Sequence, residues 1–246
     1  MISPASTRFQ LPNLKQIKHL TAIYFWRQVK TIPFFRDITS YIYYFCNKNK
    51  RIILGKNNVI QIELDGSFPF LKNVIFEIIG DCNTVILKSG VRLENTRIKI
   101  QGLQNQLILD EDCRIGGGSL WITGHDCQLI IGKNTTIVEA TIGAEGPKTS
   151  VTIGEDCMFA HGIDIRSGDS HSIIDLASNQ RLNYAQDINI GNHVWIAAKG
   201  HVLKGVSIGS NSIVGAGSIV TKDVPENCIV AGVPAQVKKT KVTWLR

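Results

Sequence analysis

The feature that most constrains the fold is a repeat of 22 residues in the middle of the chain. Five glycines mark it, at Gly80, Gly102, Gly124, Gly146 and Gly168. Five residues after each glycine stands a branched aliphatic residue: Val85, Leu107, Leu129, Val151 and Ile173. A unit this short cannot bury its own apolar face, so successive units must stack on one another. The repeat therefore predicts a solenoid in which 22 residues form about one coil of a three-sided β-helix.

The C-terminal part repeats with a shorter period of six. From residue 190 the sequence divides into IGNHVW, IAAKGH, VLKGVS, IGSNSI, VGAGSI and VTKDVP. Each hexad begins with Ile or Val, at Ile190, Ile196, Val202, Ile208, Val214 and Val220. The fifth position is small or β-branched in every hexad: Val194, Gly200, Val206, Ser212, Ser218 and Val224. One large and one small residue per six predict the filled interior of a triangular prism, with Gly, Asn, Asp and Ser at its corners.

Two cysteines fit this pattern. Cys113 in LDEDCR and Cys157 in IGEDCM occupy the small fifth position, where Cys acts as a compact hydrophobic residue. The six cysteines of the chain include no CxxC pair, and no Cys/His cluster has zinc-ligand spacing. The sequence therefore predicts neither a disulfide framework nor a metal site.

Positive charge is concentrated in residues 1–50. This segment holds eight of the 27 basic residues and one of the 20 acidic residues, which leaves 19 of each sign in the rest of the chain. The whole formal charge of +7 therefore lies in the first fifth. A concentrated positive field attracts an anionic partner, which could be a polyanionic substrate, an anionic membrane surface or nucleic acid. The alternative is a solvated basic face with no partner.

The same segment has the spacing of helices. Apolar residues recur at helical intervals at Leu20, Ile23, Trp26 and Val29, and again from Phe34 to Phe45. We predict an aromatic-rich, mainly α-helical cap over residues 1–50, a β-helix domain over 51–235 with a loop at 176–186, and a basic tail over 236–246. The alternative for the cap is an interfacial element that presses aromatic and basic side chains against a membrane.

The chain shows neither a run of about 18 apolar residues nor the h-region of a secretory signal. We therefore expect a cytoplasmic protein, with peripheral contact to the inner face of the cell membrane through residues 1–50 as an option. No recognised nucleic-acid-binding motif is present, so nucleic acid is not an expected partner.

Residues 190–237 resemble the hexapeptide-repeat acyltransferases. The runs IGNHVWI, GVSIG, GAGSIVTKDVP and AGVPA are similar to the branch that contains galactoside, maltose, nodulation-factor and capsule O-acetyltransferases. The resemblance implies an all-β fold, a left-handed parallel β-helix, acetyl-CoA as co-substrate and no metal. It also implies a homotrimer with active sites between neighbouring subunits.

His171 is the candidate general base. It occupies the fourth position of the coil that begins at Gly168, a polar corner that Asn83 and Asn105 fill in earlier coils, and an irregular segment follows it. In the resembled family the catalytic histidine precedes the tryptophan of the VWI motif by 24 residues, which selects His171 and Trp195 here. A hydroxyl needs a base to remove its proton during attack on a thioester, and imidazole changes protonation near neutral pH. The alternative is a structural corner histidine.

The other five histidines are weaker candidates, because each is more simply explained as an exposed, corner or N-terminal residue. They are His19, His125, His161, His193 and His201.

The resemblance also implies residues for the acyl donor. Trp195 matches a residue that lines the pantetheine arm, and Ala198 and Ala216 match positions where the backbone approaches the cofactor. Thr221, Lys222 and Lys239 match contacts near the nucleotide and its phosphates. Gln236 stands where a basic residue is common, and Lys238 could compensate for it; the alternative for the three lysines is a solvated tail. For the acceptor we select Arg166, Arg181 and Tyr184, because Arg can bind a carboxylate or phosphate with two hydrogen bonds.

The sequence thus predicts an O-acetyltransferase that acts by direct transfer in a ternary complex. The expected acceptor is a bacterial surface glycan, in capsule or lipopolysaccharide, and an anionic polymer would explain the basic N-terminal fifth. One alternative is an acetyltransferase for a sugar nucleotide, a free sugar or another small molecule. A second alternative is a non-catalytic β-helix that binds a polymer.

Overall fold

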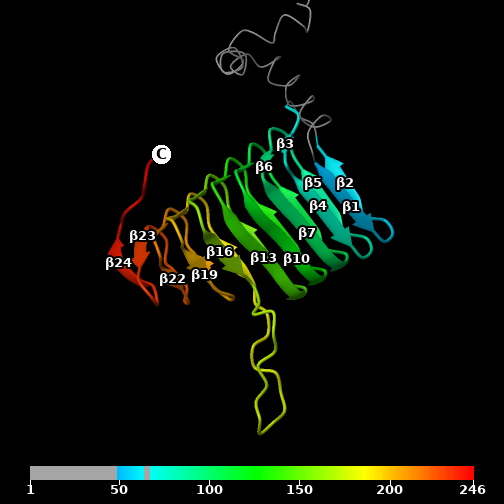
Figure 1. Cartoon of the computed structure of the whole chain (residues 1–246). Coiled ribbons are helices and arrows are strands. Elements are labelled where there is room, and N and C mark those ends of the chain that lie inside the picture. Colours follow the sequence, from blue (N-terminus) through cyan, green and yellow to red (C-terminus); the bar gives the residue numbers. More distant parts are fainter. Residues whose placement is uncertain (1–48, 64–66) are drawn as a thin grey trace, which may run out of the picture. The chain divides into compact units, whose positions relative to one another are not determined.

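The computed structural model describes residues 49–63 and 67–246. Every regular element in this part of the chain is a β-strand, and the strands form three sheets that we call A, B and C (Figure 1). Sheet A contains β1 (Lys50–Leu54), β4 (Ile75–Ile79), β7 (Thr96–Leu103), β10 (Gly118–His125), β13 (Ala140–Pro147), β16 (Ile163–Arg166), β19 (His201–Val202) and β22 (Ile219–Val220). Sheet B contains β2 (Val59–Ile62), β5 (Thr84–Leu87), β8 (Gln106–Leu109), β11 (Gln128–Ile131), β14 (Ser150–Ile153), β17 (Ile188–Ile190) and β20 (Ser207–Ile208). Sheet C contains β3 (Phe70–Lys72), β6 (Arg92–Glu94), β9 (Arg114–Ile115), β12 (Thr136–Ile137), β15 (Met158–Phe159), β18 (Trp195–Ile196), β21 (Ile213–Val214), β23 (Cys228–Ala231) and β24 (Gln236–Thr240).

The chain visits the sheets in the order A, B, C and then returns to A. From β4 to β22, each strand therefore pairs in parallel with the strand three elements before it. In the last coil β23 pairs in parallel with β21, and β24 runs antiparallel to β23. This arrangement confirms the predicted parallel β-solenoid. Its left-handed sense stays a prediction from the resemblance, and the predicted helical cap lies outside the described residues apart from Asn49 and Lys50.

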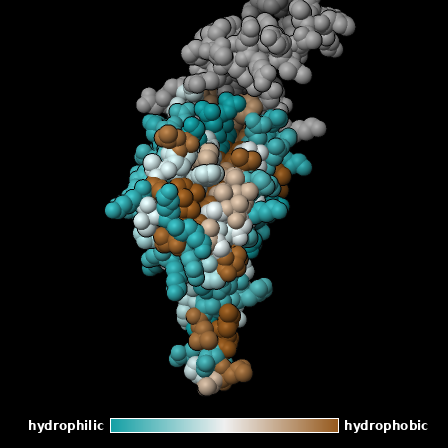
Figure 2. All heavy atoms as spheres, turned by 90° about the vertical axis from the view of Figure 1, so that its left-hand side faces the viewer, coloured by the Kyte–Doolittle hydropathy of each residue, from teal (hydrophilic) through white to brown (hydrophobic). Residues whose placement is uncertain are grey.

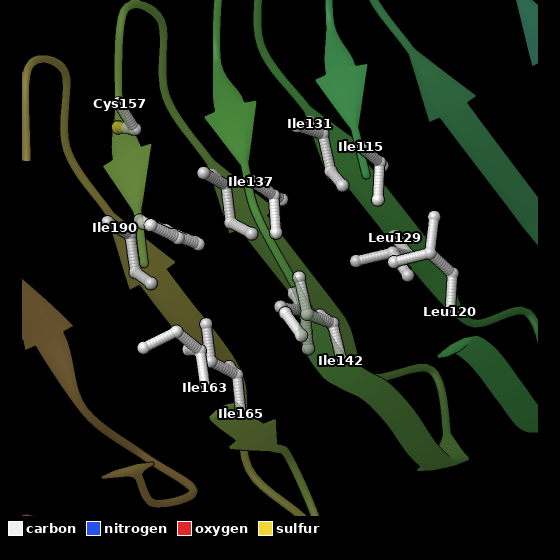
Figure 3. Close-up of a cluster of buried hydrophobic side chains, with 14 of the residues drawn as sticks. Ile115, Leu120, Leu129, Ile131, Ile137, Ile142, Cys157, Ile163, Ile165 and Ile190 are labelled. Atoms are coloured by element: carbon white, nitrogen blue, oxygen red, sulfur yellow. The ribbon is translucent and has the colours of Figure 1, made fainter. Parts of the chain in front are cut away.

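The interior of the solenoid is filled as the repeats predict. The four aliphatic residues from Val85 to Val151 in the 22-residue repeat are fully buried, and so are the first and fifth positions of all six hexads. Figure 3 shows the isoleucines and leucines of successive coils stacked in rows, with Cys157 among them. Burial raises the pKa of the Cys113 thiol to about 12 and that of Cys157 to about 11, so both stay protonated. This supports their predicted role as compact core residues.

Buried asparagines form a ladder at the corner between sheets A and B. The Oδ1 of Asn83 accepts hydrogen bonds from the backbone N–H and the Nδ2 of Asn105, both at 3.0 Å. Asn83 makes the same two bonds to Asn58 in the coil before. Asn105 Oδ1 then accepts from the N–H of Cys127 at 3.1 Å. Because a buried amide is costly unless its hydrogen bonds are made, each asparagine fixes the register of the next coil.

The corner between sheets B and C depends on left-handed backbone. Asp112, Asn134, Asp156, His193 and Asn211 occupy this corner in successive coils, each with φ between 53° and 64°. Asn and Asp adopt this conformation more readily than other non-glycine residues, because their side chains bond to the nearby backbone. His193 is the exception in the series.

The predicted fifth repeat is wrong. Gly168 and Ile173 do not stack on the coil below, because Ile173 is 57% exposed and Val151 pairs with Ile188 instead. His171 consequently does not occupy the corner position of Asn83 and Asn105. The sequence GDSHSIID imitates the coil pattern, but the pairing partner of the coil comes from a later segment.

The predicted basic tail over residues 236–246 folds back on the solenoid. Its first half forms β24, and Trp244 near its end is buried at 5% exposure. The lysines Lys238 and Lys239 on β24 are exposed.

Candidate functional site

The largest departure from the coil pattern is an excursion at the A–B corner, which we call the arm (residues 167–186). Val151 pairs with a residue 37 positions later, whereas the coil before takes 22, so the arm adds 15 residues. At its base the N–H of Gln186 donates to the carbonyl oxygen of Ser167 at 2.9 Å, which closes the excursion. The arm is the yellow segment that leaves the coils after β16 in Figure 1, and it includes the predicted loop 176–186.

Asn183 holds the two sides of the arm together. Its Nδ2 donates to Asp169 Oδ2 and to the carbonyl oxygen of His171, both at 2.8 Å, and its Oδ1 accepts from the N–H of Ile173 at 2.7 Å. Asn183 is 7% exposed. Asp169 also accepts a hydrogen bond from the ammonium group of Lys204, which belongs to the next coil. The base of the arm is therefore fixed both internally and against the solenoid.

We expect Asn183→Ala to loosen the arm without unfolding the solenoid. The hydrogen bonds of a buried amide to Asp169, His171 and Ile173 are lost, and each unsatisfied buried group costs about 1–3 kcal/mol. Amide exchange at Ile173, whose N–H bonds to Asn183, should accelerate while the amides of β14 keep their protection. The exposed Ser172→Ala serves as the control, and equal protection at Ile173 in both variants would contradict the assignment.

The ion pair at the base of the arm predicts a dependence on pH. The hydrogen bond from Lys204, aided by that from Asn183, holds the pKa of the Asp169 carboxyl below its ordinary value of 3.8. Because the folded pKa is the lower one, this stabilisation is fully present above the ordinary value and is lost as the pH falls through the folded pKa. Exchange protection of the arm should be constant from about pH 5 to pH 8, a range that lies above the ordinary pKa of a carboxyl group. It should fall in stronger acid. Asp169→Asn should remove this acid dependence, and a variant that retains it would contradict the prediction.

His171 lies in the first half of the arm and is exposed. Its backbone N–H donates to the carbonyl oxygen of Asp169 at 2.7 Å, and its carbonyl oxygen accepts from Asn183. The two nearby carboxylates are engaged elsewhere: Asp169 with Lys204 and Asn183, and Asp175 with the backbone N–H and hydroxyl of Ser178. The main chain at His171 is thus fixed, and its imidazole makes no hydrogen bond within the described part of the chain.

The candidate acceptor residues lie on or beside the arm. Arg181 places its guanidinium 5.4 Å from the centre of the Tyr184 ring and donates to the carbonyl oxygen of Asn183 at 3.2 Å. Arg166 ends β16, where the arm begins, and donates two hydrogen bonds to Asp164 at 2.7 and 2.8 Å. The arm therefore brings His171 into one region of the chain with all three predicted acceptor residues.

The candidate donor residues lie on strands of sheet C and at two corners of the solenoid. Trp195 lies on β18 in sheet C, half-buried, between Met158 and Ile213 in register. Ala198 and Ala216 occupy the corner between sheets C and A in successive coils, where the N–H of Gly217 donates to the carbonyl oxygen of Ala198 at 2.8 Å.

The remaining donor candidates lie on other elements. Lys239 is opposite Ile229 on β24, and Thr221 and Lys222 follow β22 at the A–B corner, one coil beyond Lys204. Within one chain, His171 thus shares a corner with Thr221 and Lys222, whereas Trp195, Ala198, Ala216 and Lys239 belong to sheet C and its border with sheet A.

Sequence reasoning missed the contact partners of Trp195. The centre of the Trp244 ring lies 6.3 Å from that of Trp195, and the ring of Trp244 stacks on His193. The signal available in the sequence was a tryptophan in a basic tail. Sequence reasoning also missed Asn183, for which an irregular loop sequence gives no comparable signal.

No group of three His, Cys, Asp or Glu side chains suited to a metal ion occurs among residues 49–63 and 67–246. In the same described residues, no helix has the length and apolar character needed to cross a membrane.

Comparison with known proteins places the chain among acetyltransferases. A 99-residue segment is 40% identical to the polysialic acid O-acetyltransferase of Escherichia coli O1:K1 / APEC, and covers 40% of this chain and 32% of that protein. An 89-residue segment is 44% identical to the galactoside O-acetyltransferase of Escherichia coli strain K12, and covers 36% of this chain and 43% of that protein. These matches thus span less than half of each of the two relatives. No sequence model of a known protein family matches the chain.

Solved structures match over a larger part of the chain. The crystal structure of a polysialic-acid-specific acetyltransferase aligns with a TM-score of 0.71 and 33% identity, over 80% of this chain and 89% of that one. A second polysialic acid O-acetyltransferase structure aligns with a TM-score of 0.66 and 32% identity, over 81% and 92% of the two chains. With its stacked hexads and these relatives, the chain belongs to the hexapeptide-repeat acyltransferase superfamily.

Proposed function

We propose that this protein is an O-acetyltransferase that moves an acetyl group from acetyl-CoA to a hydroxyl of a bacterial surface glycan. The observation that carries the proposal is the match at 33% identity over 89% of a polysialic-acid-specific acetyltransferase, because it spans the solenoid rather than a short motif. A negatively charged polymer of this type is also the partner that the charge of +7 in residues 1–50 favours.

In the proposed reaction His171 is the general base. Its imidazole accepts the proton of the acceptor hydroxyl while the hydroxyl oxygen attacks the carbonyl carbon of the thioester. The carbon–sulfur bond then breaks, and the imidazolium returns the proton to the leaving thiolate, which departs as the free thiol. Transfer is direct, in a ternary complex, and proton transfer of this kind contributes about 10²–10⁴-fold to the rate.

The residues proposed for acetyl-CoA have suitable chemistry. The half-buried indole of Trp195 offers a flat apolar surface to the pantetheine chain. Ala198 and Ala216 have small side chains, which permit close approach of the cofactor to the backbone. Lys222 and Lys239 are exposed and can pair with phosphates as point charges.

A second copy of the chain completes the proposed site. His171 lies at the A–B corner, whereas Trp195, Ala198, Ala216 and Lys239 belong to sheet C and its border with sheet A. A cleft between two subunits brings these residues together more simply than one chain does. The arm also carries large exposed apolar residues: Ile173, Ile174, Leu176, Leu182 and Tyr184. Figure 2 shows hydrophobic surface, in brown, at this lower end of the molecule. Leu176 is fully exposed, and a surface of this kind is typical of an interface. We therefore infer a homotrimer of left-handed β-helices, in which each arm packs on a neighbouring subunit.

A screen for acetyl-CoA consumption tests the proposal. Purified protein is incubated with polysialic acid, with a neutral polysaccharide and with a sugar nucleotide, at low and at high salt. We expect turnover with the anionic polymer and a loss of rate as salt screens the charge. Turnover with the sugar nucleotide alone would support the small-molecule alternative. Binding of the polymer without consumption of acetyl-CoA would support the polymer-binding scaffold.

A further inference from the structure

Four side chains fasten the end of the described chain to the B–C corner of the solenoid. They are Asp156, His193, Trp244 and Arg246, and we call them the clasp. The rings of His193 and Trp244 are stacked, with centres 4.1 Å apart and planes 3° from parallel. The Nε1–H of Trp244 donates to the carbonyl oxygen of His193 at 2.8 Å, and His193 Nε2 lies 3.0 Å from the carbonyl oxygen of Trp244.

Charged groups reinforce the stack from the coil below. Asp156 Oδ2 lies 2.8 Å from His193 Nδ1, and Asp156 Oδ1 accepts from Arg246 Nε at 3.0 Å. Partial burial raises the pKa of the Asp156 carboxyl, but the bonds from His193 and Arg246 outweigh this and hold it below its ordinary value. Arg246 also donates to the hydroxyl of Thr136 and to the carbonyl oxygen of Cys157, at 3.0 and 3.1 Å. The clasp thus spans three coils.

The clasp adjoins the candidate donor residues on two sides. Trp244, with 5% exposure, lies against Trp195, with ring centres 6.3 Å apart and planes at 53°. His193 is two residues before Trp195, so its left-handed backbone sets the start of β18. Trp244 lies in the same tail as β24, the strand that carries Lys239. Between them the N–H of Val242 donates to the carbonyl oxygen of Asn227 at 3.0 Å, which fixes this part of the tail to the solenoid.

We propose that the clasp is a positioning device for the acyl donor: it fixes the indole of Trp195 and the strand of Lys239, and thereby sets the affinity for acetyl-CoA. This inference rests on the proposed function, because both positioned residues are assigned there to acetyl-CoA. The clasp residues themselves touch no reacting atom. Their loss should therefore weaken donor binding and leave the acceptor side, with His171 and the arm, unchanged.

The test compares Trp244→Ala and His193→Asn with wild type. Asn keeps the left-handed corner that Asn211 adopts in the next coil, so His193→Asn removes the stack with little backbone strain. We expect each variant to raise the KM and the calorimetric Kd for acetyl-CoA about tenfold, with kcat and the KM for the glycan within about twofold. The double variant should bind no more weakly than either single one, because the two rings act as one unit. Trp244→Phe, which keeps a stacked ring, should recover most of the affinity.

Leu245→Ala is the matched control, because this side chain is adjacent to Trp244 and 90% exposed. A clasp that only stabilises the fold would lower the melting temperature and leave the Kd for acetyl-CoA unchanged, which would overturn the inference. Equal increases in KM for donor and acceptor would overturn it as well. Wild-type protein that binds no acetyl-CoA would instead contradict the proposed function, and the inference would fall with it.

Discussion

Replacement of His171 by alanine is expected to lower kcat by about 10²–10⁴-fold while the protein remains folded. The imidazole is exposed and makes no hydrogen bond in the described part of the chain, so its removal should change the free energy of unfolding by less than about 0.5 kcal/mol. The KM values for acetyl-CoA and glycan should stay within about threefold, because the base acts mainly in the transition state. Steady-state rates of thiol release and a urea titration provide the two measurements.

The matched control is His161→Ala. His161 is also exposed and lies at a corner of the solenoid, where its backbone carbonyl oxygen accepts from the N–H of Lys199. This variant should keep the wild-type rate. If His171→Ala retained more than half of the wild-type kcat, the assignment of the base would be wrong. An amine acceptor, which needs less help from a base, would then become the better hypothesis.

Replacement of Phe159 by alanine is expected to have the largest effect on stability. Phe159 is fully buried, points into the solenoid from β15, and lies in register between Ile137 and Ile196. Truncation of a buried Phe leaves a cavity that a rigid stack of coils cannot close, and such changes cost about 3–5 kcal/mol. The midpoint of urea unfolding should fall accordingly.

Phe159→Leu keeps most of the volume and is the control, with an expected loss of about 1.5 kcal/mol or less. The two variants should differ clearly in urea midpoint. A Phe159→Ala protein as stable as Phe159→Leu would show that neighbouring coils repack across the gap, which would contradict the rigid-stack interpretation.

The interior of the solenoid could be predicted from the sequence because it follows from a local rule. Each side of a coil offers space for one large and one small side chain. The hexads from Ile190 to Val224 therefore predict that their first and fifth residues are buried, and the structure agrees at every such position. The same holds for the first four members of the 22-residue repeat.

The fifth member failed because the pattern of a coil is short enough for a loop to imitate. Gly168 and Ile173 have the right spacing, but the strand that pairs with β14 begins at Ile188. Parallel pairing joins residues that are far apart in the sequence. The eight residues from Gly168 therefore do not indicate which segment pairs with β14. Among the other histidines, His193 does stand at a corner, in the B–C series between Asp156 and Asn211, as the sequence interpretation allowed for it.

The contact between His193 and Trp244 could not be predicted, because the two residues are 51 positions apart and Trp244 lies outside the repeats. The division of the site candidates between corners was equally hidden. A motif gives the position of a residue in the sequence. The corner at which that residue lies depends on the number of residues in each side of every coil.

The arm has a consequence for how this fold can vary. Val151 and Ile188 pair as they would across a coil without the arm, so the arm is a side branch whose length does not affect how the coils stack. The entropy of closing such a branch rises only with the logarithm of its length. A lineage built on this scaffold can therefore lengthen, shorten or exchange this branch, while the sequence that packs the prism stays the same.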